Sequence, residues 1–185
     1  ERWQAPRGPI EDIAGDVCSV LLAELERAGL PVTMLELEPG RYLVSDAAVL
    51  LTRVVSVKPQ PGIATYVNVD ASVAHFPLPE LQDAANRVVA VGDAAPELAD
   101  DIAIVGPSCF EDLLAWGRPL PRSRVGDLLA FLDVGACSDS YAGNTNAIPR
   151  PAVVLVAGTS CDVVRRRETL GDVFARDLIP VRLWS

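Results

Sequence analysis

A cysteine that follows a tight turn is the first residue whose type and place suggest chemistry. Cys109 ends the run Gly106-Pro107-Ser108-Cys109, directly after an apolar stretch at 101–105 that we expect to be a strand. A thiol presented there can act as an acid or a nucleophile when its surroundings tune its pKa. The alternative is a loop cysteine without a chemical role, and the motif by itself favours neither.

A second candidate is the turn Glu38-Pro39-Gly40-Arg41, at the end of a predicted strand. Proline fixes φ, glycine allows the turn, and arginine offers a planar fork of donors that suits a phosphate or a carboxylate. A structural turn with a solvent-facing arginine is the alternative interpretation, and taken alone it is the favoured one.

Residue counts restrict the chemistry further. His75 is the one histidine, so a zinc site with two or three histidines is excluded. Lys58 is the one lysine, so an amine nucleophile must be Lys58, the N-terminus or a group from another chain. None of the 4 cysteines belongs to a C-x-x-C pair. We expect Cys18 and Cys161 to be small buried hydrophobic residues.

Charge and hydropathy exclude several classes of partner. The 16 basic and 25 acidic residues give a net charge of -9, which would repel a nucleic-acid backbone or an anionic membrane surface. No apolar run approaches the ~18–20 residues that span a bilayer. The run Glu1 to Pro6 lacks the apolar core of a signal peptide. We therefore expect a cytoplasmic chain with free thiols, and no nucleic acid or membrane as partner.

The elements that must position these residues change in character along the chain. Apolar residues at three- and four-residue steps predict a helix over 11–28, ended by Gly29, and 32–38 has the pattern of a strand. One helix and one strand cannot cover both faces of a parallel sheet. The segment 1–42 is therefore predicted to be the last α/β unit of a larger domain.

The segment 43–185 is predicted to be a mainly β domain. A short helix is expected from Ser45 through Leu51, and strands are expected at 52–58, 65–69, 88–91, 101–105, 127–132, 152–156 and 161–165. The last two would form a hairpin, and 169–176 would add a final helical turn or two. Short strands at this spacing, separated by Pro/Gly turns, favour an antiparallel barrel or sandwich.

Two polar segments remain. The strand that begins at Gly126 leads past Cys137 into a loop with Asn144 and Asn146, which either closes over a ligand or simply connects two strands. The charged run 165–169 is expected to be a solvated strand end with local ion pairs.

Five motifs in this order resemble the C-terminal half of pyridoxal-phosphate-dependent amino-acid decarboxylases of the alanine-racemase-like fold, fold type III, the diaminopimelate and ornithine decarboxylase family. The resemblance runs from about residue 10 to residue 178. Its motifs are E-P-G-R at 38–41, G-P-x-C at 106–109, G-D-L-L…G-A at 126–136, N-x-N…P-R-P-A at 144–152 and R-R-R-E-T at 165–169.

The resemblance implies a division of labour. The family joins an N-terminal (β/α)8 barrel, which carries the cofactor lysine, to a C-terminal β domain. It implies that Glu38, Gly40 and Arg41 lie on the phosphate side of pyridoxal 5'-phosphate. It also implies that Cys109 donates a proton across the interface between two protomers that share active sites. Lys58 follows the E-P-G-R turn at an expected exposed strand end, so the Schiff-base lysine is not in this chain.

This sequence departs from the family's pattern at several positions. Cys137 replaces the tyrosine that reaches the phosphate, and a thiol is a much weaker hydrogen-bonding group. Phe110 replaces the acidic residue after the cysteine, and the segment with Glu111 and Asp112 is one residue short; these three are the candidate substrate-binding residues. No arginine and tyrosine match the family's pair around 75–77. Diaminopimelate, lysine and ornithine are therefore disfavoured as substrates.

Two hypotheses follow from these features. In the first, the chain is the C-terminal part of a decarboxylase for an amino acid or a carrier-bound aminoacyl group, completed by a barrel on another chain or fragment. In the second, it is a non-catalytic, decarboxylase-like interaction or regulatory subunit. Loss of the phosphate tyrosine and of the arginine–tyrosine pair favours the second hypothesis, and retention of Arg41 and Cys109 favours the first.

Overall fold

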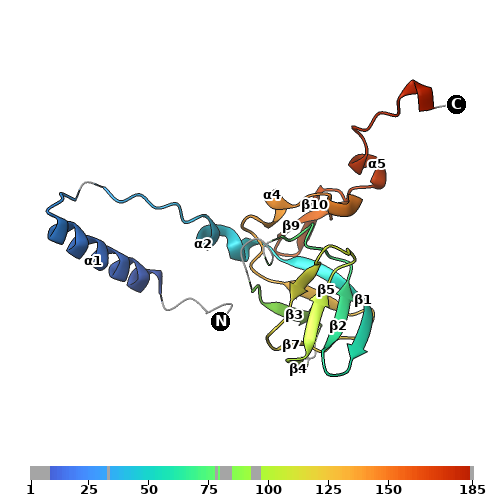
Figure 1. The fold of residues 1–185 in the computed structure, drawn as a ribbon, viewed down its shortest axis with the longest axis horizontal. Helices are drawn as coiled ribbons and strands as arrows, with labels where there is room; N and C mark the ends of the chain where they lie inside the picture. The colour runs from blue at the N-terminus through green and yellow to red at the C-terminus, as the bar shows by residue number, and fades with distance from the viewer. Residues whose placement is uncertain (1–8, 33, 78, 80–84, 93–96, 184–185) are drawn as a thin grey trace. The chain divides into compact units, whose positions relative to one another are not determined.

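The computed structural model describes residues 9–32, 34–77, 79, 85–92 and 97–183. The chain divides into two compact units, Glu1–Gly40 and Arg41–Ser185, and Figure 1 labels most of their helices and strands. The segment 1–6, on which the expectation about an export signal rests, lies outside the described residues. Among the described helices, none combines the length and the apolar character that a membrane crossing requires.

The first unit contains the predicted long helix. Helix α1 spans Ile10–Ala28, with acidic residues in its first turn and Arg27 in its last, as the helix dipole favours. Gly29 ends it with a left-handed φ of 65°. The predicted strand over 32–38 is wrong: its described residues are exposed and belong to no strand. A strand forms only when its backbone pairs with a neighbour.

The second unit is built on a six-stranded sheet in the order β3-β8-β1-β2-β5-β6. Its strands are β1 (Leu50–Gln60), β2 (Ala64–Val69), β3 (Val88–Val91), β5 (Ile102–Val105), β6 (Leu113–Ala115) and β8 (Leu128–Phe131). The sheet is not purely antiparallel as expected, because β2 and β5 pair in parallel. A parallel pair needs a long crossover, and here the chain passes through β3 and β4 between the two strands.

Smaller elements surround this curled sheet. Strands β4 (Leu98–Ala99) and β7 (Leu120–Pro121) pair with each other, and β9 (Val153–Ala157) and β10 (Ser160–Arg165) form the predicted hairpin. The short helices are α2 (Gly40–Val44), α4 (Ser138–Tyr141) and α5 (Leu170–Val173), with 3-10 turns η1 (Ser45–Ala47), η2 (Thr145–Ala147) and η3 (Val181–Leu183). The expected helix from Ser45 to Leu51 is thus only a 3-10 turn, because β1 already pairs with β8 from Leu50.

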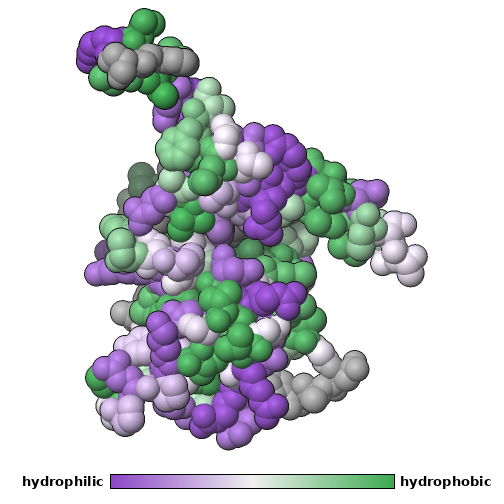
Figure 2. All heavy atoms as spheres, turned by 90° about the vertical axis from the view of Figure 1, so that its right-hand side faces the viewer, coloured by the Kyte–Doolittle hydropathy of each residue, from purple (hydrophilic) through white to green (hydrophobic). Residues whose placement is uncertain are grey.

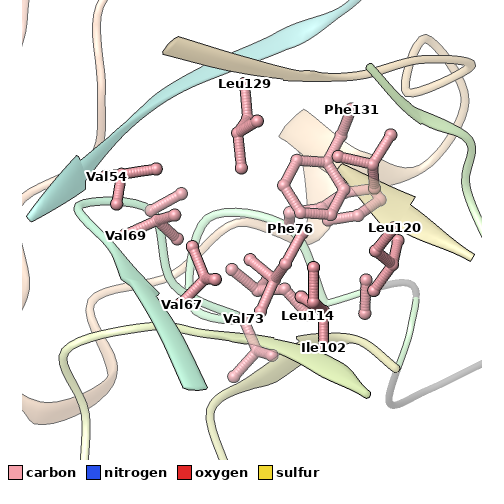
Figure 3. Close-up of a cluster of buried hydrophobic side chains, with 14 of the residues drawn as sticks. Val54, Val67, Val69, Val73, Phe76, Ile102, Leu114, Leu120, Leu129 and Phe131 are labelled. Carbon is pink, nitrogen blue, oxygen red and sulfur yellow. The ribbon is translucent and has the colours of Figure 1, made fainter. Parts of the chain in front are cut away.

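One hydrophobic cluster fills the space inside the sheet (Figure 3). Strands β1, β2, β5 and β8 contribute to it, and the turn that follows β2 adds Phe76, which is fully buried. The rings of Phe76 and Phe131 lie with their centroids 5.6 Å apart and inclined by 57°. Aromatic pairs in this geometry add attraction beyond area burial. The turn at 72–76 is therefore anchored in the core.

Apolar side chains also reach the surface of the molecule. Figure 2 shows them interspersed with polar ones on one face. The β9–β10 hairpin exposes Val156 and Val163 by 63% and 67%. The expectation that Cys18 and Cys161 are buried is wrong, since both are exposed. No described residue of α1 is buried. A two-stranded hairpin such as β9–β10 can bury its apolar side chains only when another layer packs against it.

Candidate functional site

The thiol of Cys109 is exposed on the loop between β5 and β6. Asp112 closes this loop: its Oδ2 accepts a hydrogen bond of 2.9 Å from the backbone N–H of Ser108. The backbone oxygen of Asp112 accepts a second bond, of 2.7 Å, from the N–H of Gly106. The Ser108 hydroxyl in turn accepts a bond of 3.1 Å from the N–H of Phe110. The loop is therefore a closed, internally bonded turn that presents the thiol outward.

Gly106 is required for this closure. A Cβ on Gly106 would collide with the carboxylate of Asp112. Since that carboxylate is buried, it has little freedom to move away. The glycine of the G-P-x-C motif thus makes room for the acidic side chain that holds the loop.

The turn at 72–76 is the support for the loop. The backbone N–H of Val73 donates a hydrogen bond of 2.6 Å to Oδ1 of Asp112, in a buried position. On the other side of the turn, the carbonyl oxygen of Ala74 accepts a bond of 2.9 Å from the N–H of Gly143. Because Phe76 anchors the same turn in the core, the Cys109 loop and the segment after α4 share one rigid support.

His75 links the same turn to the chain before β9. Its Nε2 lies 3.0 Å from the carbonyl oxygen of Pro149. A carbonyl only accepts, so Nε2 carries the hydrogen and donates it. Burial of the ring lowers the pKa of His75 below its ordinary 6.5, although the bond to Pro149 opposes that shift. A neutral, structural histidine is the result.

Polar side chains after α4 complete the support. Asn146 donates from Nδ2 to the Ser108 hydroxyl at 2.6 Å, which fastens the far side of the Cys109 loop. Asn144 donates from Nδ2 to Glu168 at 2.7 Å. Glu168 also accepts a bond of 2.8 Å from Nε of Arg150, and these bonds lower its pKa to about 2. The N-x-N motif therefore holds loops together in this chain.

The charged run 165–169 forms one local ion pair, as predicted, between Arg166 and Asp172 at 2.6 Å. Arg165 pairs instead with Asp139, which is distant in the sequence. Hydrogen bonds from Arg166 lower the pKa of Asp172, which also caps α5 together with Thr169. This run is structural.

A pocket of about 240 Å³ lies beside the Cys109 loop. Its lining comes from the turn after β2, from the Cys109 loop, and from α4 with the residues that follow it. The lining residues are Val73, Ala74, Pro77, Phe110, Tyr141, Gly143 and Thr145.

The candidate substrate-binding residues differ in exposure. Phe110 is 54% exposed and lines the pocket. Glu111 is exposed and has a φ of 20°, which a non-glycine residue rarely adopts. Asp112 is buried, with its carboxylate turned toward the backbone of Val73 and Ser108. This geometry favours a positioning role for Asp112, whereas contact with substrate stays a prediction for Phe110 and Glu111.

The phosphate-side candidates lie on two segments that meet. The N–H of Gly135 donates to the carbonyl oxygen of Ser45 at 2.8 Å, and a Cβ on Gly135 would collide with the carbonyl oxygen of Val44. The chain that leads from β8 to Cys137 is thus in contact with the end of α2, the helix that carries Arg41. Cys137 itself is exposed and has a left-handed φ of 64°.

The other two candidates on the phosphate side belong to the first unit. The N–H of Gly40 donates to the carbonyl oxygen of Glu38 at 2.8 Å, and both residues are exposed. A guanidinium and glycine backbone suit the phosphate end of an anionic cofactor. Lys58 is exposed on β1, opposite Tyr66 of β2, and is not among the residues that line the pocket.

Sequence reasoning missed the support of the Cys109 loop. Val73 and Ala74 act through their backbone atoms, which no side-chain pattern identifies. Tyr141 was also missed, although an aromatic residue in a loop otherwise rich in small and polar residues was a usable signal.

The curled, mixed sheet with a thiol on the loop between two of its strands is the C-terminal β domain of a fold-type III decarboxylase. The family described as "Pyridoxal-dependent decarboxylase, C-terminal sheet domain" matches residues 41–135, and the chain belongs to this family.

Relatives extend the match beyond the sheet domain. The chain is 35% identical over 175 residues to the diaminopimelate decarboxylase of Methanothermobacter thermautotrophicus, covering 94% of this chain and 40% of that protein. It is 40% identical over 142 residues to the diaminopimelate decarboxylase of Deinococcus radiodurans, covering 76% of this chain and 36% of that protein. The chain therefore spans well under half the length of these relatives.

Solved structures agree with the sequence relatives. A diaminopimelate decarboxylase of M. jannaschii in co-complex with L-lysine superimposes with a TM-score of 0.78 at 31% identity, covering 98% of this chain and 41% of that one. An arginine decarboxylase of Paramecium bursaria Chlorella virus shares the fold, with a TM-score of 0.53 at 20% identity.

Proposed function

We propose that this chain is the C-terminal part of a pyridoxal-phosphate-dependent amino-acid decarboxylase, and that Cys109 is its proton donor. The observation that carries the proposal is the exposed thiol on a loop that Asp112 and Asn146 fasten from two sides. A general acid must be held in position to be effective. The substrate is an amino acid or an aminoacyl group on a carrier.

The chemistry assigned to this chain is one proton transfer. The bond between Cα and the carboxylate carbon of the substrate breaks, CO₂ leaves, and the electron pair stays on Cα. The Sγ–H of Cys109 then gives its proton to Cα, and the resulting thiolate regains a proton from water. Pyridoxal 5'-phosphate, when bound, supplies the electron sink for the pair left on Cα.

Arg41 is proposed to bind the cofactor phosphate, with Glu38 and Gly40 shaping the turn that precedes it. The contact between Gly135 and the end of α2 supports this role, because it fixes the helix that carries Arg41. Cys137 follows the same contact and is proposed to face the phosphate with its thiol.

The barrel that bears the cofactor lysine is proposed to lie on another chain or fragment, in a homo- or hetero-oligomer with shared active sites. Segment 1–42 would be the end of such a barrel. Its exposed apolar residues, among them Met34 at 76% and Leu37 at 68% exposure, favour a partner that covers them. Four exposed free thiols favour the reducing conditions of the cytoplasm.

The alternative function is a non-catalytic, decarboxylase-like subunit. One observation favours it: the position of the phosphate-binding tyrosine holds Cys137, which a left-handed φ of 64° strains further. Such a subunit would need the sheet and its apolar surfaces but not the thiol of Cys109.

The two functions separate in a mutational test of the assembled enzyme. Cys109→Ala should lower the rate of decarboxylation by about 10²–10⁴-fold while cofactor occupancy stays unchanged. Cys161→Ala, on the β10 strand, is the matched control because it also removes an exposed thiol. Equal, small losses of activity in both variants would rule out the catalytic role of Cys109 and favour the non-catalytic subunit.

A further inference from the structure

We propose that the pocket beside the Cys109 loop binds the side chain of the substrate, and that it selects an apolar side chain. This inference rests on the proposed decarboxylase function and adds the class of substrate to it. The main observation in its support is the position of Phe110, which directly follows the proton donor Cys109 and lines the pocket.

The chemistry of the lining favours an apolar ligand. Val73, Ala74, Pro77 and Phe110 contribute apolar surface, and Tyr141 adds an aromatic ring. Apart from the Tyr141 phenol, none of the described residues that line the pocket carries an ionisable side chain. A charged distal group would therefore lose its hydration here without gaining an ionic partner, which is costly.

Two backbone N–H groups of the lining are already bonded within the protein. The N–H of Val73 donates to Asp112, and the N–H of Gly143 donates to the carbonyl oxygen of Ala74. These two donors are thus occupied before any ligand enters. Tyr141 and Thr145 supply hydroxyl groups, which can form hydrogen bonds with a neutral polar group of the ligand but cannot neutralise a charged one.

The same bonds make the pocket a preformed one. The bond from Val73 to Asp112 joins the turn to the Cys109 loop, and the bond from Gly143 joins the turn to the segment after α4. Asn146 closes the arrangement by donating to Ser108. A pocket whose walls are joined in this way selects among ligands by their shape, because moving the walls to fit another ligand would break these hydrogen bonds.

The size of the pocket agrees with one amino-acid side chain. Its volume of about 240 Å³ is smaller than the roughly 300–1,000 Å³ of pockets for drug-sized ligands. We place the substrate Cα at the Cys109 thiol and the substrate side chain against Phe110, the next residue along the chain, which lines the pocket.

The test compares substrates in the assembled enzyme, this chain together with the lysine-bearing barrel. We expect kcat/KM for leucine, methionine or phenylalanine to exceed that for diaminopimelate, lysine or ornithine. Phe110→Glu should lower kcat/KM for the apolar amino acids at least about 10-fold and shift preference toward lysine and ornithine. Phe110→Leu, which keeps the apolar surface, should preserve the preference.

Val125→Glu is the matched control, since it places the same charge at an exposed apolar residue in the turn before β8. An enzyme that prefers diaminopimelate, lysine or ornithine, with a preference that Phe110→Glu leaves unchanged, would overturn the pocket assignment and leave the decarboxylase function intact. An assembly that decarboxylates no amino acid would overturn both.

A second readout is independent of turnover. Leucine or methionine should slow the alkylation of Cys109 by iodoacetamide in the assembled enzyme, measured by peptide mapping, while lysine should not. Cys161 is the internal control because it is an exposed thiol on a different element. Equal protection of both thiols, or protection of Cys109 by lysine alone, would contradict the proposal.

Discussion

The buried carboxylate of Asp112 accepts a hydrogen bond of 2.6 Å from the backbone N–H of Val73, and this bond fixes the Cys109 loop to the turn after β2. The second carboxylate oxygen bonds the N–H of Ser108 within the loop itself. One side chain therefore controls both the internal shape of the loop and its attachment to the core.

Asp112→Ala should release the loop. It would leave the buried N–H of Val73 and the half-buried N–H of Ser108 without their acceptor. A buried unsatisfied donor costs about 1–3 kcal/mol. We expect a lower free energy of unfolding in urea and faster alkylation of Cys109. Asp162→Ala, which removes an exposed carboxylate on β10, is the control and should change neither quantity. An unchanged alkylation rate in Asp112→Ala would refute the positioning role.

Gly135→Ala should disrupt the contact between the segment after β8 and the end of α2. The new methyl group would collide with the carbonyl oxygen of Val44, a backbone atom that cannot rotate away. Overpacking of this kind typically costs about 1–3 kcal/mol. The melting temperature should fall in Gly135→Ala, whereas Gly143→Ala, where a Cβ meets open space, should leave it nearly unchanged. Equal melting temperatures in the two variants would show that the contact is unimportant.

Strands β1, β2, β3, β5, β8, β9 and β10 were predictable because each contains an apolar run of several residues. Strands β4, β6 and β7 were not predicted, since a strand of two or three residues is too short to show a pattern. The hairpin β9–β10 and strand β3 lie within a residue or two of their expected ranges. The parallel pairing of β2 with β5 was not predictable, since register and direction depend on a crossover of more than 30 residues rather than on local pattern.

The candidate site was predictable in its residue types and not in their orientation. The G-P-x-C motif located Cys109 on a loop directly after a strand, but no sequence pattern indicated that Asp112 turns inward. The support of the loop depends on backbone atoms of Val73 and Ala74, which every residue possesses. Likewise, the segment 32–38 has the composition of a strand but forms none in its described residues. A strand also needs a neighbouring strand for its backbone hydrogen bonds, and the sequence of the segment does not reveal whether one is present.

The stability of the chain should depend on pH through His75. Burial lowers the pKa of His75 below the 6.5 of the unfolded chain, so the unfolded state binds a proton more readily. Its contribution to stability is therefore fully present above pH 6.5 and is lost as the pH falls from there toward the lower pKa of the folded state. As the sequence has one histidine, other side chains with ordinary pKa values do not titrate in this window.

The measurement is urea unfolding at about pH 7.5 and about pH 5.5, on either side of the ordinary histidine pKa. The free energy of unfolding should be lower at the acidic value. His75→Gln keeps a donor for the carbonyl oxygen of Pro149 but does not titrate, so its unfolding should change less between the two conditions. A variant with the same pH dependence as the natural chain would show that His75 is not the responsible group.

Lys58 should have no covalent role in the reaction. An amine nucleophile is activated by burial in an apolar site or by a neighbouring cation, and Lys58 is exposed on β1 opposite Tyr66. Lys58→Arg keeps the positive charge and removes the nucleophile. We expect this variant to retain cofactor occupancy and decarboxylation in the assembled enzyme.

Borohydride reduction followed by peptide mapping should place the pyridoxal label on the barrel-bearing partner. Stoichiometric label on Lys58, or loss of the cofactor in Lys58→Arg, would mean that this chain carries the cofactor lysine, and would remove the need for a second chain or fragment.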